Sequence, residues 1–193
     1  VEAELNSNRI ARIILTSKNK KAVLYSASSI EILDLKGLEK HTYISRLGPD
    51  VLDKNIDHKM IFSRLTNKKF RNRAFASLYL DQSFLAGIGN YLRTEILWSA
   101  GLSPFGTPSK TPEQKLKKLA KLSLSIPRRS LATNGWTLTE TQKKKFSEEK
   151  SRFAVFARQG KKCLSCDARI DKIYISGRRL YKCDNCQPIT KSL

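Results

Sequence analysis

The chain has 193 residues, 40% of them hydrophobic, and its 37 Lys and Arg residues against 17 Asp and Glu give a formal net charge of +20 at pH 7. No apolar run reaches the roughly 18 residues typical of a membrane-spanning helix, and the N-terminal stretch VEAELNSNR lacks the apolar segment of a signal peptide. We therefore expect a cytoplasmic protein without a membrane partner, and the positive charge favours nucleic acid as the partner.

Residues 9–33 are rich in Ile, Val, Leu and Tyr, which predicts β-strands, and the polar stretch SKNKK (17–21) predicts a turn between two of them. Two or three strands form only a marginal structure by themselves. We therefore expect these strands to lie at the edge of a larger sheet.

From about residue 54 to residue 135, apolar residues recur at helical spacing, which predicts a series of helices. One of these helices is expected to end near Ala86. Two stretches, 63–73 and 142–162, are strongly basic. A solvated helix face explains most single charge runs, but the position of these two beside the motifs below favours contact with phosphate.

All four cysteines lie in one module, as Cys163, Cys166, Cys183 and Cys186, with the pattern C-x2-C-x16-C-x2-C. Each C-x2-C pair can direct two thiolates at one point, and four thiolates suit tetrahedral Zn²⁺. The alternatives are two disulfides or a redox-active pair, and the lack of an export signal disfavours disulfides. We predict one structural zinc ion bound by these four residues.

The residues between the two cysteine pairs alternate around Ser176-Gly177, which predicts a β-hairpin with a tight turn. Zinc would order this hairpin, which is too small to fold alone. Arg178 and Arg179 would then lie at its tip, where a guanidinium can bind a phosphate through two hydrogen bonds. Two solvated surface arginines are an equally acceptable interpretation of these residues alone.

A further motif, Gly87-Ile88-Gly89-Asn90, predicts a tight turn followed by a helix with Asn90 as its N-cap. The free N–H groups and the positive dipole end of that helix would form an anion site, to which the Asn90 amide adds. An ordinary hairpin of two helices explains the same residues, because a G-x-G-N turn is a weak signal in isolation.

Three segments occur together in this chain: LGPDVL (47–52), DQSFLAGIGNYLRTEILW (81–98) and the four-cysteine hairpin with GRRLYKC (177–183). In order and spacing they resemble the formamidopyrimidine-DNA glycosylase / endonuclease VIII family, from about residue 9 to residue 188. YLRTEILW and the strand LYSASSIEIL are more similar to the endonuclease VIII branch, which acts on oxidised pyrimidines.

The resemblance implies an α+β fold in three parts. Residues 1–48 would be the last strands of an N-terminal β-sandwich, residues 49–150 a helix–two-turn–helix DNA-binding domain, and residues 151–193 a zinc finger. The partner implied is double-stranded DNA with an oxidised base or an abasic site, bound by a monomer at the bacterial nucleoid.

The resemblance also implies roles for individual residues. Arg46, just before LGPD, would contact DNA, and Asn90 would bind a phosphate near the lesion. Arg178 would lie on the phosphates that flank the flipped nucleotide and would take part in δ-elimination. No matching role can be assigned to Arg179.

The activity implied is base-excision repair by a DNA glycosylase that is also an abasic-site lyase. The damaged base is swung out of the helix, because its glycosidic bond is unreachable inside the stack. In the family, an N-terminal proline amine attacks the anomeric carbon to form an iminium ion, and the neighbouring glutamate assists proton transfer. β- and δ-elimination then cut the strand.

This sequence departs from the family at its start, where the family has Pro-Glu-Gly-Pro-Glu and a large β-sandwich. We therefore expect a C-terminal piece of an endonuclease VIII-like enzyme, which binds DNA and zinc and is inactive by itself. Val1-Glu2 offers an α-amine beside a carboxylate, but the residues that follow do not continue the family's pattern.

Two other classes of protein remain open. A non-catalytic zinc-dependent nucleic-acid binder would prefer RNA or a particular DNA sequence and would ignore abasic sites. A protein-interaction zinc ribbon with incidental charge would bind DNA with a shallow dependence on salt.

Overall fold

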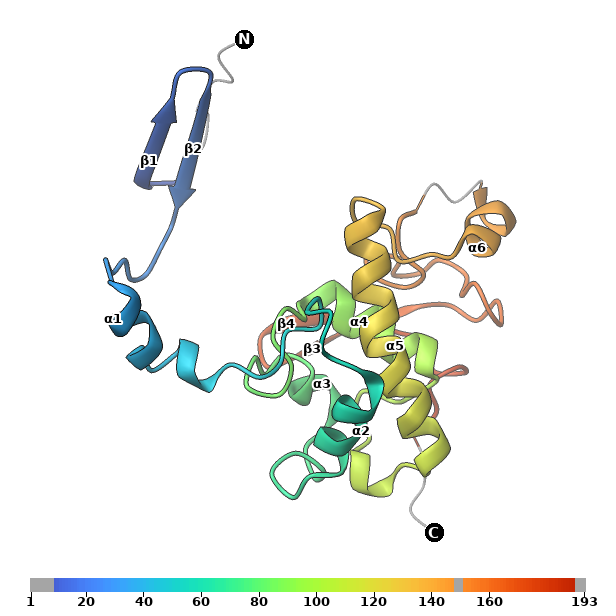
Figure 1. Cartoon of the computed structure of the whole chain (residues 1–193). Helices are drawn as coiled ribbons and strands as arrows, with labels where there is room; N and C mark the ends of the chain where they lie inside the picture. The colour runs from blue at the N-terminus through green and yellow to red at the C-terminus, as the bar shows by residue number, and fades with distance from the viewer. Residues whose placement is uncertain (1–8, 148–150, 190–193) are drawn as a thin grey trace. The chain divides into compact units, whose positions relative to one another are not determined.

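The computed structural model describes residues 9–147 and 151–189. The chain divides into two compact units, Val1–Ser45 and Arg46–Leu193, each considered by itself (Figure 1). Helices and short antiparallel strands are both present, which confirms the predicted α+β class. Within the described residues, every helix is too short or too polar to span a lipid bilayer.

The first unit is built on an antiparallel hairpin, in which β1 (Ala11–Ser17) pairs with β2 (Lys20–Tyr25). A short helix, α1 (Leu35–Lys40), follows. The hairpin confirms the two predicted strands and the turn between them. None of the residues 9–45 is buried, so this unit has no core of its own.

The second unit contains most of the helices and a second hairpin. A 3-10 turn, η1 (Ile44–Arg46), crosses the boundary between the two units. The elements that follow it are α2 (His58–Thr66), α3 (Phe75–Leu78), α4 (Asn90–Ala100), η2 (Pro108–Lys110), α5 (Glu113–Ala132), α6 (Glu140–Lys145), β3 (Asp171–Ile175) and β4 (Arg178–Lys182). The longest helix, α5, packs against both α2 and α4, and α4 also contacts β4.

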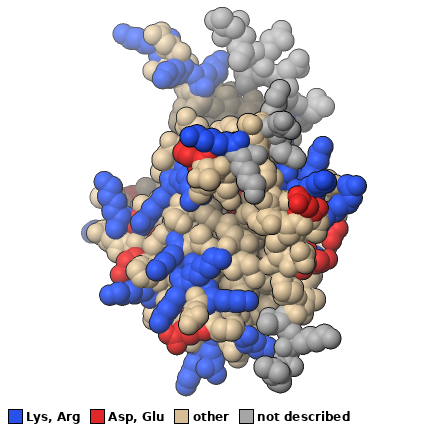
Figure 2. Space-filling view, turned by 90° about the vertical axis from the view of Figure 1, so that its right-hand side faces the viewer, with Lys and Arg blue, Asp and Glu red and all other residues tan. Residues whose placement is uncertain are grey.

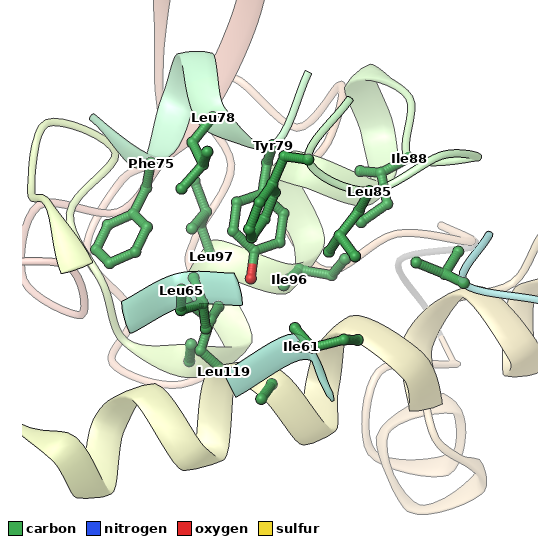
Figure 3. Close-up of a cluster of buried hydrophobic side chains, with 14 of the residues drawn as sticks. Ile61, Leu65, Phe75, Leu78, Tyr79, Leu85, Ile88, Ile96, Leu97 and Leu119 are labelled. Carbon is green, nitrogen blue, oxygen red and sulfur yellow. The ribbon is translucent and has the colours of Figure 1, made fainter. Parts of the chain in front are cut away.

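The main core lies between α2, α4 and α5 (Figure 3). Ile61 and Leu65 are four residues apart, so they project from one face of α2 and meet Leu119 of α5. The Tyr79 ring is fully buried, and its hydroxyl is hydrogen-bonded to that of Ser123 at 2.8 Å. This core holds the start of α4, and with it the candidate site, on a rigid base.

The prediction that a helix continues to Ala86 is wrong. The helix α3 ends at Leu78, and turns follow it. The Asp81 carboxylate accepts a hydrogen bond from the Ser83 N–H at 2.8 Å and forms an ion pair with Arg73. Such a side-chain to backbone bond competes with helix formation, which explains the early end.

A second, smaller core joins α4 to the C-terminal hairpin. Trp98 of α4 is buried there with Val155, Ile170 and the hairpin residue Tyr181. Four aromatic rings also contact one another in a row, with centroids 5.2 to 5.3 Å apart: Tyr91, Phe153, Phe156 and Tyr181. The hairpin is therefore packed directly on α4.

Glu95 of α4 attaches the segment that precedes the hairpin. Its side chain is only 2% exposed. Its Oε2 accepts hydrogen bonds from the Thr137 hydroxyl at 2.7 Å and the Ala154 N–H at 2.8 Å. Its Oε1 accepts from the N–H groups of Val155 and Phe156, both at 2.9 Å. The 154–156 segment is thus docked on α4 by three backbone hydrogen bonds to Glu95.

Candidate nucleic-acid interface and metal centre

The thiols of Cys163, Cys166, Cys183 and Cys186 converge at one point. Their Sγ atoms all lie within 4.8 Å of one another, and adjacent pairs are 3.4 to 3.7 Å apart. All four thiols are free, at separations well above the ~2.05 Å of a disulfide bond. Four thiolates at ~2.3 Å from a tetrahedral Zn²⁺ would be about 3.8 Å apart. The cluster therefore fits a metal site closed by four sulfur atoms.

Three of these thiols, those of Cys166, Cys183 and Cys186, are in environments that shift their acidity. A hydrogen bond from Asn185 is the largest cause that lowers the pKa of Cys166, to about 6. Burial raises the pKa of Cys183 and that of Cys186. Because metals bind thiolates, a cation in this cluster would have to stabilise the charged forms that burial disfavours.

The hairpin between the cysteine pairs has the predicted tight turn. β3 and β4 pair antiparallel with Ile175 opposite Arg178, so two residues form the loop. Ser176 and Gly177 have φ values of 51° and 72°, which is the conformation of a type I′ turn. Arg178 and Arg179 are both exposed at the start of β4, and as neighbours on a strand they point to opposite faces.

Two side chains bind the cysteine module to the C-terminal part of α4 and to the residue Leu102 that follows its C-cap. The Trp98 indole N–H donates to Cys163 Sγ at 3.4 Å. Gln187 accepts from the Cys183 N–H at 3.1 Å and donates to the Leu102 carbonyl oxygen at 2.9 Å. Trp98 is therefore both a residue of the second core and a hydrogen-bond donor to a candidate metal ligand.

The first turn of α4 is hydrogen-bonded to the start of β4. Asn90 donates through Nδ2 to the Arg179 carbonyl oxygen at 2.7 Å, and its Oδ1 accepts from Arg93 Nη2 at 2.5 Å. Burial and the nearby charge of Arg178 lower the pKa of Arg93 to about 10. The fold thus brings together two of the predicted DNA-contact residues, Asn90 and Arg178. We call this place the α4–β4 junction.

Asn90 is not the N-cap that the sequence predicts. The N-cap is Gly89, which has no side chain to accept a hydrogen bond, and Asn90 is the first helical residue. The Asn90 amide is bonded to the hairpin, so it does not cap its own helix. The first N–H groups of α4 therefore lack a side-chain cap, which leaves the helix start available to an anion.

The LGPD segment lies against the turn that precedes α4. The Gly48 N–H donates to the Gln82 carbonyl oxygen at 2.8 Å, and the Ala86 N–H donates to the Pro49 carbonyl oxygen at 3.0 Å. Arg46, the third predicted DNA-contact residue, is exposed at the start of this segment. Among the described residues, no hydrogen bond or ion pair joins its side chain to the α4–β4 junction.

Gly48 is required by the close approach of two main chains. A Cβ atom at this position would lie 2.7 Å from the carbonyl oxygens of Ser83 and Phe84. Arg64 holds both oxygens, through Nη2 to Ser83 at 2.6 Å and Nε to Phe84 at 2.8 Å, so they cannot easily move away.

We expect Gly48→Ala to lower the free energy of unfolding by about 2 kcal/mol, as overpacking against the backbone does. Urea denaturation of the metal-loaded protein measures the loss. Gly89→Ala is the matched control, because an added Cβ there meets nothing within 4 Å. Equal stability of the two variants would contradict the steric argument.

The fold divides the basic stretch 63–73. Arg64 donates hydrogen bonds to the Ser83 and Phe84 carbonyl oxygens, and Arg73 forms an ion pair with Asp81, so both have partners within the protein. The exposed members of the stretch are Lys68, Lys69 and Arg71. Figure 2 shows Lys and Arg side chains over much of one face, with a smaller number of Asp and Glu side chains among them. Positive charge therefore extends well beyond the α4–β4 junction.

Sequence reasoning missed Arg93 and Glu95 as residues of consequence. Both are charged and both are buried, Arg93 with 0% exposure. The available signal was their position inside YLRTEILW, where two charges interrupt an otherwise largely apolar helix. A charged residue in such a setting is buried only when it is paired or hydrogen-bonded.

Comparison with known proteins agrees with these features. The family model "Formamidopyrimidine-DNA glycosylase H2TH domain" matches residues 47–142. Endonuclease 8 of Klebsiella pneumoniae is 42% identical over 184 residues, which is 95% of this chain and 68% of the relative. This chain belongs to the formamidopyrimidine-DNA glycosylase / endonuclease VIII family. Endonuclease 8 of Escherichia coli strain K12 / DH10B shows the same identity and coverage.

Solved structures of the family share the fold. The MutM (Fpg) protein of Thermus thermophilus superposes with a TM-score of 0.69 at 22% identity, over 92% of this chain and 68% of that one. Lactococcus lactis Fpg in complex with abasic-site DNA gives a TM-score of 0.64 at 21% identity, over 81% of this chain. The match spans 57% of the Lactococcus chain.

Proposed function

We propose that this chain binds double-stranded DNA at oxidised bases and abasic sites, as part of a base-excision repair glycosylase with abasic-site lyase activity. The observation that carries the proposal is the α4–β4 junction, where an uncapped helix start, the Asn90 amide and the Arg178 charge meet. N–H donors and a fixed positive charge at one point suit a DNA phosphate. Because the chain resembles the endonuclease VIII branch, we propose oxidised pyrimidines as the lesions, and the site of action would be the nucleoid of a bacterial cytoplasm.

Within this proposal each site residue has a separate task. Asn90 would bind a phosphate near the lesion from the start of α4. Arg178 would bind the phosphates that flank the flipped nucleotide and would assist δ-elimination. Arg46 would add a contact from the LGPD segment, which Gly48 holds against the turn before α4.

We further propose that the ion held by Cys163, Cys166, Cys183 and Cys186 is zinc. Four sulfur ligands leave no open coordination position, so the part of the ion is to stabilise the finger rather than to bind substrate. An ordered β4 keeps the Arg179 carbonyl oxygen in place, and this oxygen accepts the Asn90 amide. Metal binding would therefore also set the geometry of the α4–β4 junction.

We propose that residues 1–48, which include the first unit, are the end of a β-sandwich. The lack of any buried residue among residues 9–45 supports this assignment, because two strands need further strands to form a core. Residues 49–150 would then be the helix–two-turn–helix domain and residues 151–193 the finger, with Glu95 joining the two.

The amine that attacks the sugar has no assigned counterpart among the described residues. Val1, considered above for this role, lies outside them. We therefore propose that the described residues bind and orient DNA, and that cleavage of the glycosidic bond depends on groups outside them.

The test of the proposed function is borohydride trapping on a duplex with one abasic site, run beside a native-gel shift over a series of salt concentrations. We expect a zinc- and salt-dependent shift without a covalent adduct. A covalent adduct would show that an amine of this chain is placed for lyase chemistry, with Val1 the first candidate. A preference for RNA over abasic DNA would instead favour a non-catalytic nucleic-acid binder.

Alanine variants of the α4–β4 junction test the footprint. Asn90→Ala and Arg178→Ala should each weaken binding to abasic-site DNA by roughly 1–3 kcal/mol, because each removes a charged or helix-end phosphate contact. Fluorescence anisotropy with a labelled duplex measures the dissociation constants. Unchanged affinity in both variants would refute the assignment of the junction to DNA.

A further inference from the structure

Arg93 has an unusual environment for a charged residue. Its side chain is fully buried, and its Nη1 donates to the Ala76 carbonyl oxygen at 2.9 Å. Its Nη2 donates to Asn90 Oδ1 at 2.5 Å and to the Arg179 carbonyl oxygen at 3.2 Å. The guanidinium therefore bridges α3, α4 and β4, and all of its acceptors are neutral.

In the part of the chain that the structure describes, no carboxylate pairs with this buried charge. Within residues 9–147 and 151–189, Arg93 forms no ion pair, and its Nε has no hydrogen-bond partner. The oxygens of Glu95, on the same helix, are taken by Thr137 and the 154–156 backbone. Burial, together with the charge of another cation, Arg178, lowers the pKa of Arg93 to about 10.

Three positive features therefore meet at the α4–β4 junction: the start of α4, the exposed Arg178 and the buried Arg93. A buried charge without a counter-ion is unfavourable, and a like charge beside it adds to the cost. An anion bound at the junction would lower both costs, that of the missing counter-ion and that of the repulsion between Arg93 and Arg178. Under the proposed function, that anion is a DNA phosphate.

We propose that Arg93 is a positioning residue of the phosphate site, which holds Asn90 and β4 in register and whose uncompensated buried charge is neutralised by the bound phosphate. This inference rests on the proposed DNA-binding function and adds to the phosphate site a residue that is fully buried. The competing explanation is a core arginine that only bridges three carbonyl-type oxygens. A neutral side chain with N–H donors could take over that task.

The decisive experiment compares two variants of Arg93. Arg93→Gln keeps N–H donors and loses the charge, whereas Arg93→Lys keeps the charge and loses the planar guanidinium. Affinity for an abasic-site duplex is measured over a series of salt concentrations. We expect Arg93→Gln to bind about tenfold more weakly and to lose about 0.9 from the slope of log K against log[salt], the contribution of one phosphate. Arg93→Lys should retain most of the slope.

The matched control is Arg128→Gln, an exposed α5 arginine whose hydrogen bonds among the described residues go to the Asp53 and Ile56 carbonyl oxygens rather than to Asn90, Arg93 or β4. Its affinity should stay within about twofold of the unmodified chain. An unchanged salt slope in Arg93→Gln, or identical slopes in Arg93→Gln and Arg93→Lys, would overturn the inference. If the unmodified chain shows no salt-dependent DNA binding, the proposed function fails as well.

A second measurement does not depend on the folding of an Arg93 variant. Arg178→Gln should raise the melting temperature of the DNA-free, metal-loaded protein relative to Arg179→Gln, because it removes the charge that repels Arg93. Arg179 is the suitable reference, since it is the next residue on the same strand and points to the other face. Equal or lower melting temperature for Arg178→Gln would contradict an uncompensated charge at Arg93.

Discussion

Cys183→Ser will unfold the finger and abolish tight binding to abasic-site DNA. Metal binding contributes on the order of 10 kcal/mol or more to modules of this size, and three sulfur ligands with a hydroxyl cannot supply that energy. With the finger unfolded, Arg178 loses its rigid support and Asn90 loses the Arg179 carbonyl oxygen. Zinc content by atomic absorption and affinity by anisotropy measure the two effects, and Cys163→Ser should behave in the same way.

Ser165→Ala is the control for this experiment, because Ser165 lies in the same C-x2-C turn and its exposed side chain is not a ligand. It should keep both zinc and DNA affinity. A double variant tests whether the finger and Asn90 act together on DNA binding. Asn90→Ala should weaken binding in the unmodified chain and should have no further effect in Cys183→Ser. Tight DNA binding by Cys183→Ser, or by a fully chelated protein, would refute the role of the finger.

Glu95→Ala will lower the free energy of unfolding by about 4 kcal/mol, because four buried donors lose their acceptor at once and each unsatisfied donor costs about 1–3 kcal/mol. These donors are the Thr137 hydroxyl and the N–H groups of residues 154–156. Trp98, on the same helix and in the second core, provides a fluorescence signal for urea denaturation. The free energy of unfolding of Glu95→Gln should lie between those of the unmodified chain and Glu95→Ala, since its amide oxygen can still accept some of the four hydrogen bonds.

The control for Glu95 is Glu113→Ala on α5. Glu113 is exposed and pairs with Lys117 in solvent, so its removal should change the free energy of unfolding by at most about 0.5 kcal/mol. A Glu95→Ala variant as stable as Glu113→Ala would mean that water or another group satisfies the four donors. In that case the segment before the hairpin would not depend on Glu95 for its position.

Several features of the fold were predictable because neighbouring residues determine them. The C-x2-C pairs place two thiols at one point, and Ser176-Gly177 can adopt the two positive φ angles of a tight hairpin turn. The helical spacing of apolar residues likewise predicted that α2, α4 and α5 bury one face. The prediction went wrong at α3, where the side chain of Asp81 bonds to the backbone and stops the helix.

The sequence by itself determined the cysteine cluster, the hairpin, the helical region and the family, since each of these is a local pattern or an ordered set of such patterns. Only the tertiary structure decided what Asn90, Arg93, Glu95 and Arg64 do. The partners of Asn90 and Arg93 on β4 are 89 and 86 positions away, and those of Glu95 lie up to 61 positions away. Burial decides the rest: a charged side chain removed from water must take whatever donors or acceptors the fold brings to it, and no local pattern specifies which these are.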